Sequence, residues 1–79
     1  MRKQKVKQDI CIGSNIRKLR QRAGLTQDQT AAKLQIEGID ISRDFYAHIE
    51  TGVYNIRVSE LSAIRKILKA AYDEIFEGL

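Results

Sequence analysis

The residues best suited to chemistry lie close together near the middle of the chain. Arg43 and His48 are five positions apart, with Asp44 and Ala47 between them. An arginine can donate two hydrogen bonds to guanine O6 and N7, and a histidine can donate to a purine N7 or a phosphate. Asp44 can accept from the cytosine amino group or stabilise a helix N-terminus, and Ala47 can meet a thymine methyl. The four residues predict the reading of base edges, provided that one helix presents them.

The sequence around these residues favours such a helix over about 42–51. Ser42 suits the N-cap position, and Gly52 suits the residue that ends the helix. The helix has three apolar anchors, Phe45, Tyr46 and Ile49. The polar residues then fall on the other face, and a capped helix with a small polar outer face fits the major groove of DNA.

A second helix is expected just before this one, starting after Thr26. Thr26 and Gln29 have the spacing of a capping box, in which each side chain bonds the other residue's backbone N–H. The helix continues through Ala31, Ala32 and Leu34. Residues 35–41 then form a turn, in which Gly38 favours a positive φ.

The remaining helices are expected over about 10–23, 58–69 and 72–77. Their apolar positions are Ile12, Ile16, Leu19 and Ala23, then Val58, Leu61, Ile64, Ile67 and Leu68, and finally Ile75 and Phe76. No long stretch alternates apolar and polar residues, so strands are not expected. The sequence predicts an all-α, compact five-helix bundle, with residues 10–79 as a single domain behind a flexible basic arm at residues 1–9.

The distribution of charge and the number of cysteines limit the classes of partner and site that the chain can have. Residues 1–27 carry eight basic residues and one acidic residue, whereas residues 28–79 carry six basic and nine acidic residues. This asymmetry suggests a polyanionic partner, although a solubilising tail and a solvated helix face give the same pattern. One cysteine, Cys11, and one histidine are too few for a zinc site, and Cys11 is expected to be a small, mostly buried hydrophobe. We expect a cytoplasmic protein without a metal, a cofactor or a membrane span.

Short motifs follow one another along residues 12–77 in a specific order. They are Ile16-Arg17-Lys18-Leu19-Arg20, Gly24-Leu25-Thr26-Gln27, Ala31-Ala32-Lys33-Leu34, Ser42-Arg43, Ile49-Glu50-Thr51-Gly52, Glu60-Leu61, Ile64, Leu68 and Asp73-Glu74-Ile75-Phe76. In this order they resemble the Cro/cI-type (XRE, lambda repressor-like) family of helix-turn-helix DNA-binding domains. The resemblance implies that the helices after Thr26 and Ser42 form the helix-turn-helix, with the second as the recognition helix.

The resemblance also implies roles for residues around the recognition helix. Gln27 matches a glutamine that commonly contacts a DNA phosphate, and the helix N-termini at Thr26 and Ser42 add backbone donors. Further phosphate contacts are expected from three residues after the recognition helix, Tyr54, Asn55 and Arg57, with inward packing as the alternative for Tyr54. Arg20 matches an arginine that pairs with the glutamate ending the recognition helix, here Glu50. Such a pair would hold the recognition helix against the rest of the domain.

Three departures from the family pattern predict local differences. The turn at residues 35–41 is longer than the usual tight form, which affects the tilt of the recognition helix. Thr30 occupies a common leucine position, so the two central helices are expected to pack more loosely. Lys69 and Ala71 stand where a glycine and a serine or threonine N-cap are usual, so a less regular corner is expected there.

The implied function is sequence-specific binding of double-stranded DNA by a transcriptional regulator. The regulator is expected to be a homodimer and a repressor, and no small-molecule effector is expected. The dimer surface is expected at the chain end, through Tyr72, Ile75, Phe76 and Leu79. Alternatively, Ile75 and Phe76 simply close the core of a monomer. The main alternative function is a protein-interaction module, such as an antitoxin or a regulator-binding domain. An enzyme is the least supported class, because no nucleophile–base set or glycine-rich phosphate loop is visible.

Overall fold

The segments with helical apolar spacing form helices in the computed structural model, which describes residues 12–52 and 56–78. The helices are α1 (Ile12–Arg22), α2 (Gln27–Ile36), α3 (Arg43–Thr51), α4 (Val58–Leu68) and α5 (Tyr72–Ile75). These described ranges contain no strand, so the predicted all-α five-helix fold is confirmed. The predictions for the arm at residues 1–9 and for Cys11, Tyr54, Asn55 and Leu79 lie outside the described residues.

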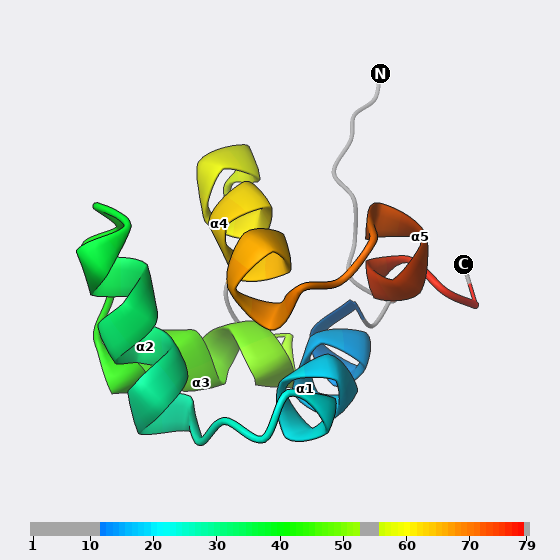
Figure 1. Cartoon of the computed structure of the whole chain (residues 1–79), viewed down its shortest axis with the longest axis horizontal. Helices are drawn as coiled ribbons and strands as arrows, with labels where there is room; N and C mark the ends of the chain where they lie inside the picture. The colour runs from blue at the N-terminus through cyan, green and yellow to red at the C-terminus, as the bar shows by residue number, and fades with distance from the viewer. Residues whose placement is uncertain (1–11, 53–55, 79) are drawn as a thin grey trace.

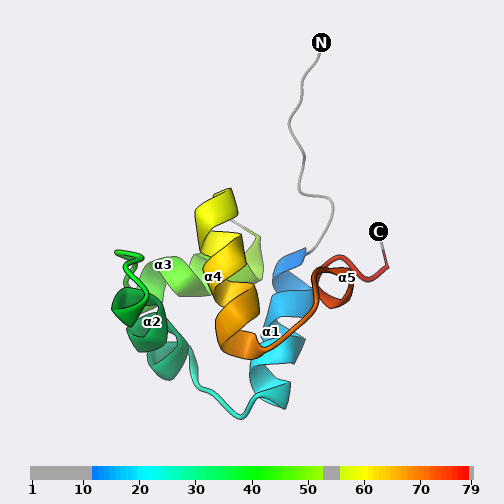
Figure 2. The same ribbon diagram turned by 45° about the horizontal axis from the view of Figure 1, so that its top comes forward.

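The helices pack around one core that holds α2 and α3 as a pair. α3 packs against both α1 and α2, while α4 packs against α2 and α5 packs against α1 (Figure 1). A view turned by 45° shows α5 again beside α1, on the opposite side of the bundle from α2 (Figure 2). The fully buried apolar side chains come from all five helices and are Ile16, Leu34, Tyr46, Ile64, Leu68 and Ile75. Because every helix contributes to this core, the position of α3 depends on the whole bundle.

The long connection between α2 and α3 is ordered by its own hydrogen bonds. α2 runs to Ile36, so it includes the first two residues of the predicted turn. Gly38 has a φ of 92°, as predicted, and the backbone N–H of Ile39 reaches back to the carbonyl of Leu34 over 2.9 Å. The Gln35 side chain donates to the carbonyl of Ile41 over 2.8 Å, and Ile41 itself is buried. The longer connection is therefore a packed element that fixes the start of α3.

Thr30 does not open a gap between the two central helices. Its side chain is fully buried, and its hydroxyl donates to the carbonyl of Thr26 over 2.9 Å. The polar group is satisfied within its own helix, so it can occupy an apolar site without an unpaired donor. The predicted loosening is not seen at this position.

The corner between α4 and α5 is regular in spite of its unusual residues. Lys69 adopts the left-handed conformation that glycine usually supplies, with a φ of 54°. The N–H of Ala70 donates to the carbonyl of Arg65 over 3.0 Å, which closes the helix end. Ala71 has no capping side chain, but the Glu74 carboxylate accepts from its backbone N–H over 2.9 Å. One half of a capping box is therefore enough to start α5.

Four apolar helix positions predicted from the sequence are exposed instead of buried, and Phe76, at 40% exposed, is one of them. Ala23 follows the last turn of α1, Val58 is the first residue of α4, and Phe45 lies beside the buried stripe of α3. At the end of a helix, or next to its buried stripe, an apolar residue can match the spacing without having a neighbour to pack against. Helix α5 also ends at Ile75 rather than at residue 77.

Candidate nucleic-acid interface

The N-termini of α2 and α3 are both capped by their own side chains. The Thr26 hydroxyl accepts from the backbone N–H of Gln29 over 3.0 Å, and the Gln29 side chain accepts from the N–H of Thr26 over 2.9 Å. The predicted capping box is thus present. The Ser42 hydroxyl accepts from the backbone N–H of Phe45 over 3.2 Å, which starts α3 at Arg43. Both helix starts are defined locally, so their positive dipole ends have fixed positions.

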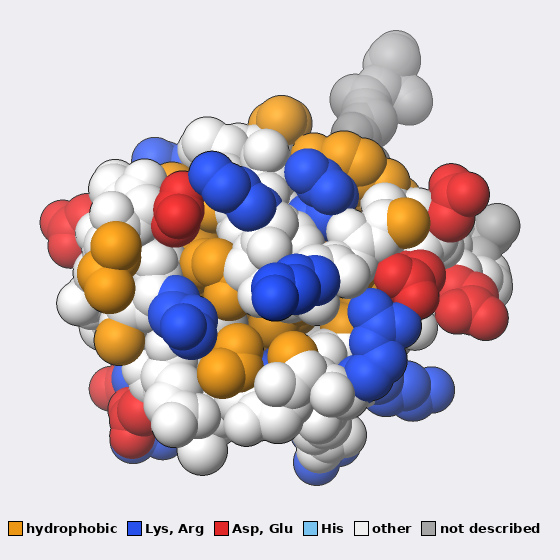
Figure 3. All heavy atoms as spheres, in the orientation of Figure 1, with side chains coloured by type: hydrophobic (Ala, Val, Ile, Leu, Met, Phe, Trp, Pro, Cys, Tyr) orange, Lys and Arg blue, Asp and Glu red, His pale blue; other side chains and the backbone are white. Residues whose placement is uncertain are grey.

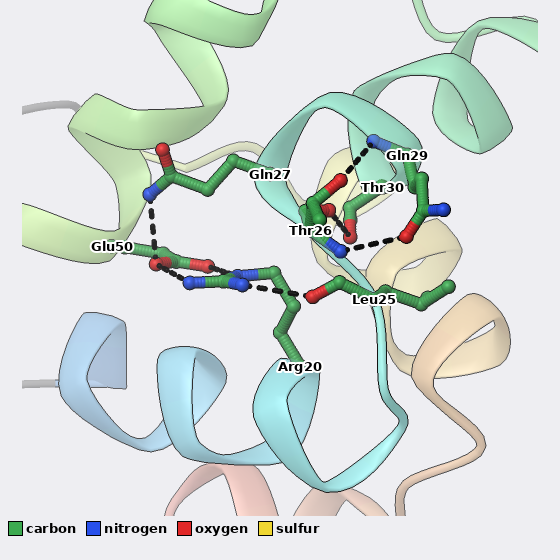
Figure 4. A network of polar contacts seen from close by, with 7 residues as sticks. All are labelled: Arg20, Leu25, Thr26, Gln27, Gln29, Thr30 and Glu50. Atoms are coloured by element: carbon green, nitrogen blue, oxygen red, sulfur yellow. Dashed lines mark hydrogen bonds and ion pairs between the residues drawn. The ribbon is translucent and has the colours of Figure 1, made fainter.

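A buried ion pair joins α1 to the end of α3, as the resemblance implied (Figure 4). Arg20 Nε donates to Glu50 Oε2 over 2.6 Å, and Arg20 Nη2 donates to Glu50 Oε1 over 3.1 Å. The two side chains are only 11% and 2% exposed. Arg20 Nη1 also donates to the carbonyl of Leu25 over 2.8 Å, and Gln27 Nε2 donates to Glu50 Oε1 over 3.1 Å. One carboxylate therefore ties together α1, the start of α2 and the end of α3.

The hydrogen bonds of this network shift the pKa values of Glu50 and Arg20 toward their charged forms. Burial by itself would raise the pKa of Glu50, but hydrogen bonds from Arg20 and Gln27 outweigh it and hold the pKa below its usual value. The hydrogen bond to Glu50 raises the pKa of Arg20 in turn. Burial also raises the pKa of the neighbouring Tyr46 hydroxyl, and the Glu50 carboxylate adds to this effect. The lowered pKa of Glu50 favours an intact ion pair at neutral pH.

At Gly13 the backbone of α1 also packs closely against the backbone of α3. A Cβ atom added at Gly13 would lie 2.4 Å from the carbonyl oxygen of Ile49 and 2.6 Å from that of Glu50. No side chain larger than a hydrogen atom fits there without moving backbone. The crossing was not predicted, because a glycine within a helix does not reveal which element crosses it.

The outward side of α3 carries the predicted base-reading residues. Arg43, Asp44 and His48 are exposed, and Ala47 is partly buried. Arg43 Nε lies 3.5 Å from Asp28 Oδ1, on α2, and 3.9 Å from Asp44 Oδ1. The structure therefore brings the four predicted residues together on one helix, but it pairs Arg43 with a carboxylate, that of Asp28, which the sequence did not single out.

The residues predicted to contact phosphates are spread over three helix starts. Thr26 and Gln27 lie at the start of α2, Ser42 at the start of α3, and Arg57 at the start of α4. Arg57 is exposed, and its backbone N–H donates to the Glu60 carboxylate over 2.8 Å. Gln27 differs from Thr26 and Ser42, because its side chain bonds to another helix, at Glu50 of α3, whereas theirs cap their own helices.

The chain end does not present all the apolar residues predicted for a dimer surface. Ile75 is 0% exposed and belongs to the core of the single chain, because α5 packs against α1 with this side chain inward. Its assignment to a dimer surface is therefore wrong. Tyr72 and Phe76 remain exposed at 44% and 40%. The Arg65 guanidinium lies 4.9 Å from the centre of the Tyr72 ring, which gives this surface a mixed aromatic and basic character.

Polar contacts from two side chains of α1, which the sequence did not predict, attach α5 to α1. Asn15 Nδ2 donates to the carbonyls of Ile75 and Glu77, at the end of α5 and just beyond it, over 2.8 and 2.9 Å. Arg22 Nη1 lies 2.6 Å from Glu74 Oε2 at the surface. Hydrogen bonds from Arg22 and from the backbone at Ala71 lower the pKa of Glu74 to about 2.

Positive charge is not confined to the neighbourhood of α3. Figure 3 shows lysine and arginine side chains spread over the face on which α4 lies in front, with acidic side chains toward its edges. Among the described residues, no three histidine, cysteine, aspartate or glutamate side chains are grouped as metal ligands. None of the described helices has the length and apolarity to span a bilayer.

Comparison with known families agrees with this geometry. A family model described as a helix-turn-helix domain matches residues 12–75, and the chain belongs to that family. The resemblance to Cro/cI-type domains is thereby confirmed at the level of the helix-turn-helix family. No curated protein and no solved structure matches the chain.

Proposed function

We propose that the chain is a sequence-specific double-stranded DNA-binding regulator that places α3 in the major groove. The observation that carries this proposal is the buried network around Glu50. It fixes α3 against α1 and the start of α2, while Arg43, Asp44 and His48 stay exposed on α3. A rigid pair of helices with one outward polar face is what reading of base edges requires.

In this proposal base contacts and phosphate contacts come from different residues of the domain. Arg43, Asp44, Ala47 and His48 on α3 face base edges. Phosphates are contacted by residues at the starts of α2, α3 and α4, namely Thr26, Gln27, Ser42 and Arg57. Tyr54 and Asn55 are proposed to add two further phosphate contacts. Phosphate contacts position the domain, and base contacts provide the sequence preference.

Two copies of the chain are proposed to bind one operator. A single recognition helix reads few base pairs, and a twofold pair doubles the contacts with half-sites about 34 Å apart. The surface proposed to join the copies contains the exposed Phe76 and the exposed Tyr72, whose ring lies against the Arg65 guanidinium. By occupying the operator, the dimer would act as a repressor of transcription.

Selection from random duplexes followed by binding at several salt concentrations tests DNA binding directly. If about six phosphates are neutralised, the logarithm of the binding constant falls with the logarithm of salt concentration at a slope near −5. Arg43→Ala should lose preference for the selected site, by about 1–3 kcal/mol, whereas Gln27→Ala should weaken all duplexes alike. Failure to bind a selected duplex at about 50 mM salt, or binding unaffected by salt, contradicts the proposal.

A second candidate is a module that binds a partner protein. Exposed aromatic side chains favour it, since Phe45 on α3 and Phe76 next to α5 are 51% and 40% exposed. The duplex selection separates the two functions, because a protein-binding module enriches no sequence.

A further inference from the structure

Phe45 is the exposed aromatic residue on the proposed DNA-reading helix. Its side chain is 51% exposed, although the same helix buries Tyr46 and Ile49 almost completely. Phenylalanine is among the residues most often buried in proteins. A half-exposed phenylalanine within a polar surface is therefore a candidate for contact with an apolar group of a partner.

The ring of Phe45 has a defined place on α3. It lies edge-on to the ring of His48, with 6.1 Å between the ring centres and 89° between the planes. The two residues are three positions apart, so they are neighbours on the helix surface. An apolar ring and a polar ring are thus presented together, beside the exposed Asp44.

The major groove offers one apolar group at the edge of the bases. Adenine, guanine and cytosine present hydrogen-bond donors and acceptors there, whereas thymine adds its C5-methyl group. Phenylalanine is one of the side chains whose apolar contact with this methyl group is known. A phosphate oxygen would find no hydrogen-bond donor in the ring, and a base amino group only a weak N–H···π contact.

We propose that Phe45 reads a thymine methyl group in the major groove and so determines part of the sequence preference. This inference rests on the proposed function, and it adds an apolar contact to the polar ones assigned to Arg43 and His48. The operator half-site should contain a thymine whose methyl group is needed for full affinity. His48, held edge-on to the ring, would contact the same or an adjacent base pair.

Replacing thymine with deoxyuridine removes only the methyl group and keeps every hydrogen-bonding group of the base pair. We would exchange each thymine of a selected duplex in turn and measure affinity by fluorescence anisotropy. One thymine in each half-site should matter for the wild-type protein. Its loss should weaken binding about fourfold, which corresponds to about 0.8 kcal/mol for one buried methyl group.

The variant that tests the role of the ring is Phe45→Ala, with Phe45→Leu as the conservative change. Phe45→Ala should bind more weakly and become indifferent to uracil at the critical position, while Phe45→Leu should keep part of the difference. Val58→Ala is the matched control, because Val58 is also exposed and apolar but lies on α4. It should show the wild-type uracil profile, and unchanged melting temperatures would exclude a general loss of folding.

The outcomes separate this inference from the proposed function. A wild-type protein that binds its selected site but tolerates uracil at every position overturns the role of Phe45 alone. The same conclusion follows if Phe45→Ala keeps the wild-type uracil profile. Failure to select any duplex would instead refute both the proposed function and this inference.

Discussion

Replacing Gly13 with alanine should separate α1 from α3 and lower the stability of the domain. The added Cβ would lie 2.4 and 2.6 Å from two carbonyl oxygens of α3, closer than the roughly 3.0 Å that such contacts permit. Both obstructing atoms belong to the backbone, so no side chain can rotate away. One helix must shift by several tenths of an ångström, and the shift acts directly on the residues that carry the Glu50 network.

Two opposing effects set the size of the change. Alanine is favoured over glycine within a helix by about 1 kcal/mol. Overpacking of a well-filled contact costs about 1–3 kcal/mol, and a cost of about 2–3 kcal/mol is expected here because backbone must move. We therefore expect a net loss of about 1–2 kcal/mol of unfolding free energy, or roughly 4–16 °C in melting temperature for a domain of this size.

Urea unfolding followed by circular dichroism measures this loss. Ser14→Ala is the matched control, because Ser14 is the exposed neighbour in the same helix. That variant should be neutral or more stable by up to about 0.5 kcal/mol. A Gly13→Ala protein that gains stability, as helix propensity alone predicts, would show that α1 and α3 do not cross so closely.

Four further predictions concern the ion pair, its dependence on pH, the α4 end and the chain end. Alanine at Arg20 or at Glu50 should each cost about 2–4 kcal/mol, and the double variant less than their sum, because a lone buried charge is the main penalty; additive losses would mean that the two residues act independently. The pKa of Glu50 is lowered on folding, so its contribution is complete above its ordinary value of 4.5 and is lost as the pH falls through the lowered value. Acid titration of Glu50→Gln should accordingly show a smaller loss of stability than the wild type in that range. Lys69→Gly should raise the melting temperature through about 1 kcal/mol of relieved strain, whereas Lys33→Gly, inside α2, should lower it by a similar amount; equal effects at both sites would contradict the left-handed backbone at Lys69. Phe76→Glu should convert a dimer into a monomer in sedimentation at tens of micromolar; a wild-type protein that is already monomeric there rules out a dimer preformed through this surface.

Features fixed by neighbouring residues were predictable from the sequence. The capping box at Thr26 and Gln29, the N-cap at Ser42 and the positive φ of Gly38 each depend on a few adjacent positions, and all three are present. The pair of Arg20 and Glu50 was found only through the family resemblance, because thirty positions separate the two residues.

Features that depend on how distant segments meet were not predictable in this way. Gly13 and Asn15 gave no signal, since their roles arise where α1 meets α3 and the chain end. Phe45 and Val58 matched an apolar spacing and are nevertheless exposed, because the spacing does not show where a neighbouring helix ends. Ile75 was assigned to a partner surface, whereas the fold turns it inward.

The hydrogen bond from Gln27 to Glu50 has a consequence for the thermodynamics of binding. A glutamine amide has two N–H groups, and Glu50 engages one of them over 3.1 Å before any partner arrives. A free surface glutamine loses about 0.5–1.5 kcal/mol of conformational freedom when a partner immobilises it. Here the bond within the domain already restricts the side chain, so a phosphate that meets its second N–H would find a preorganised donor. Loss of the Glu50 carboxylate would then appear in binding calorimetry as a less favourable entropy, even at temperatures where the variant stays folded.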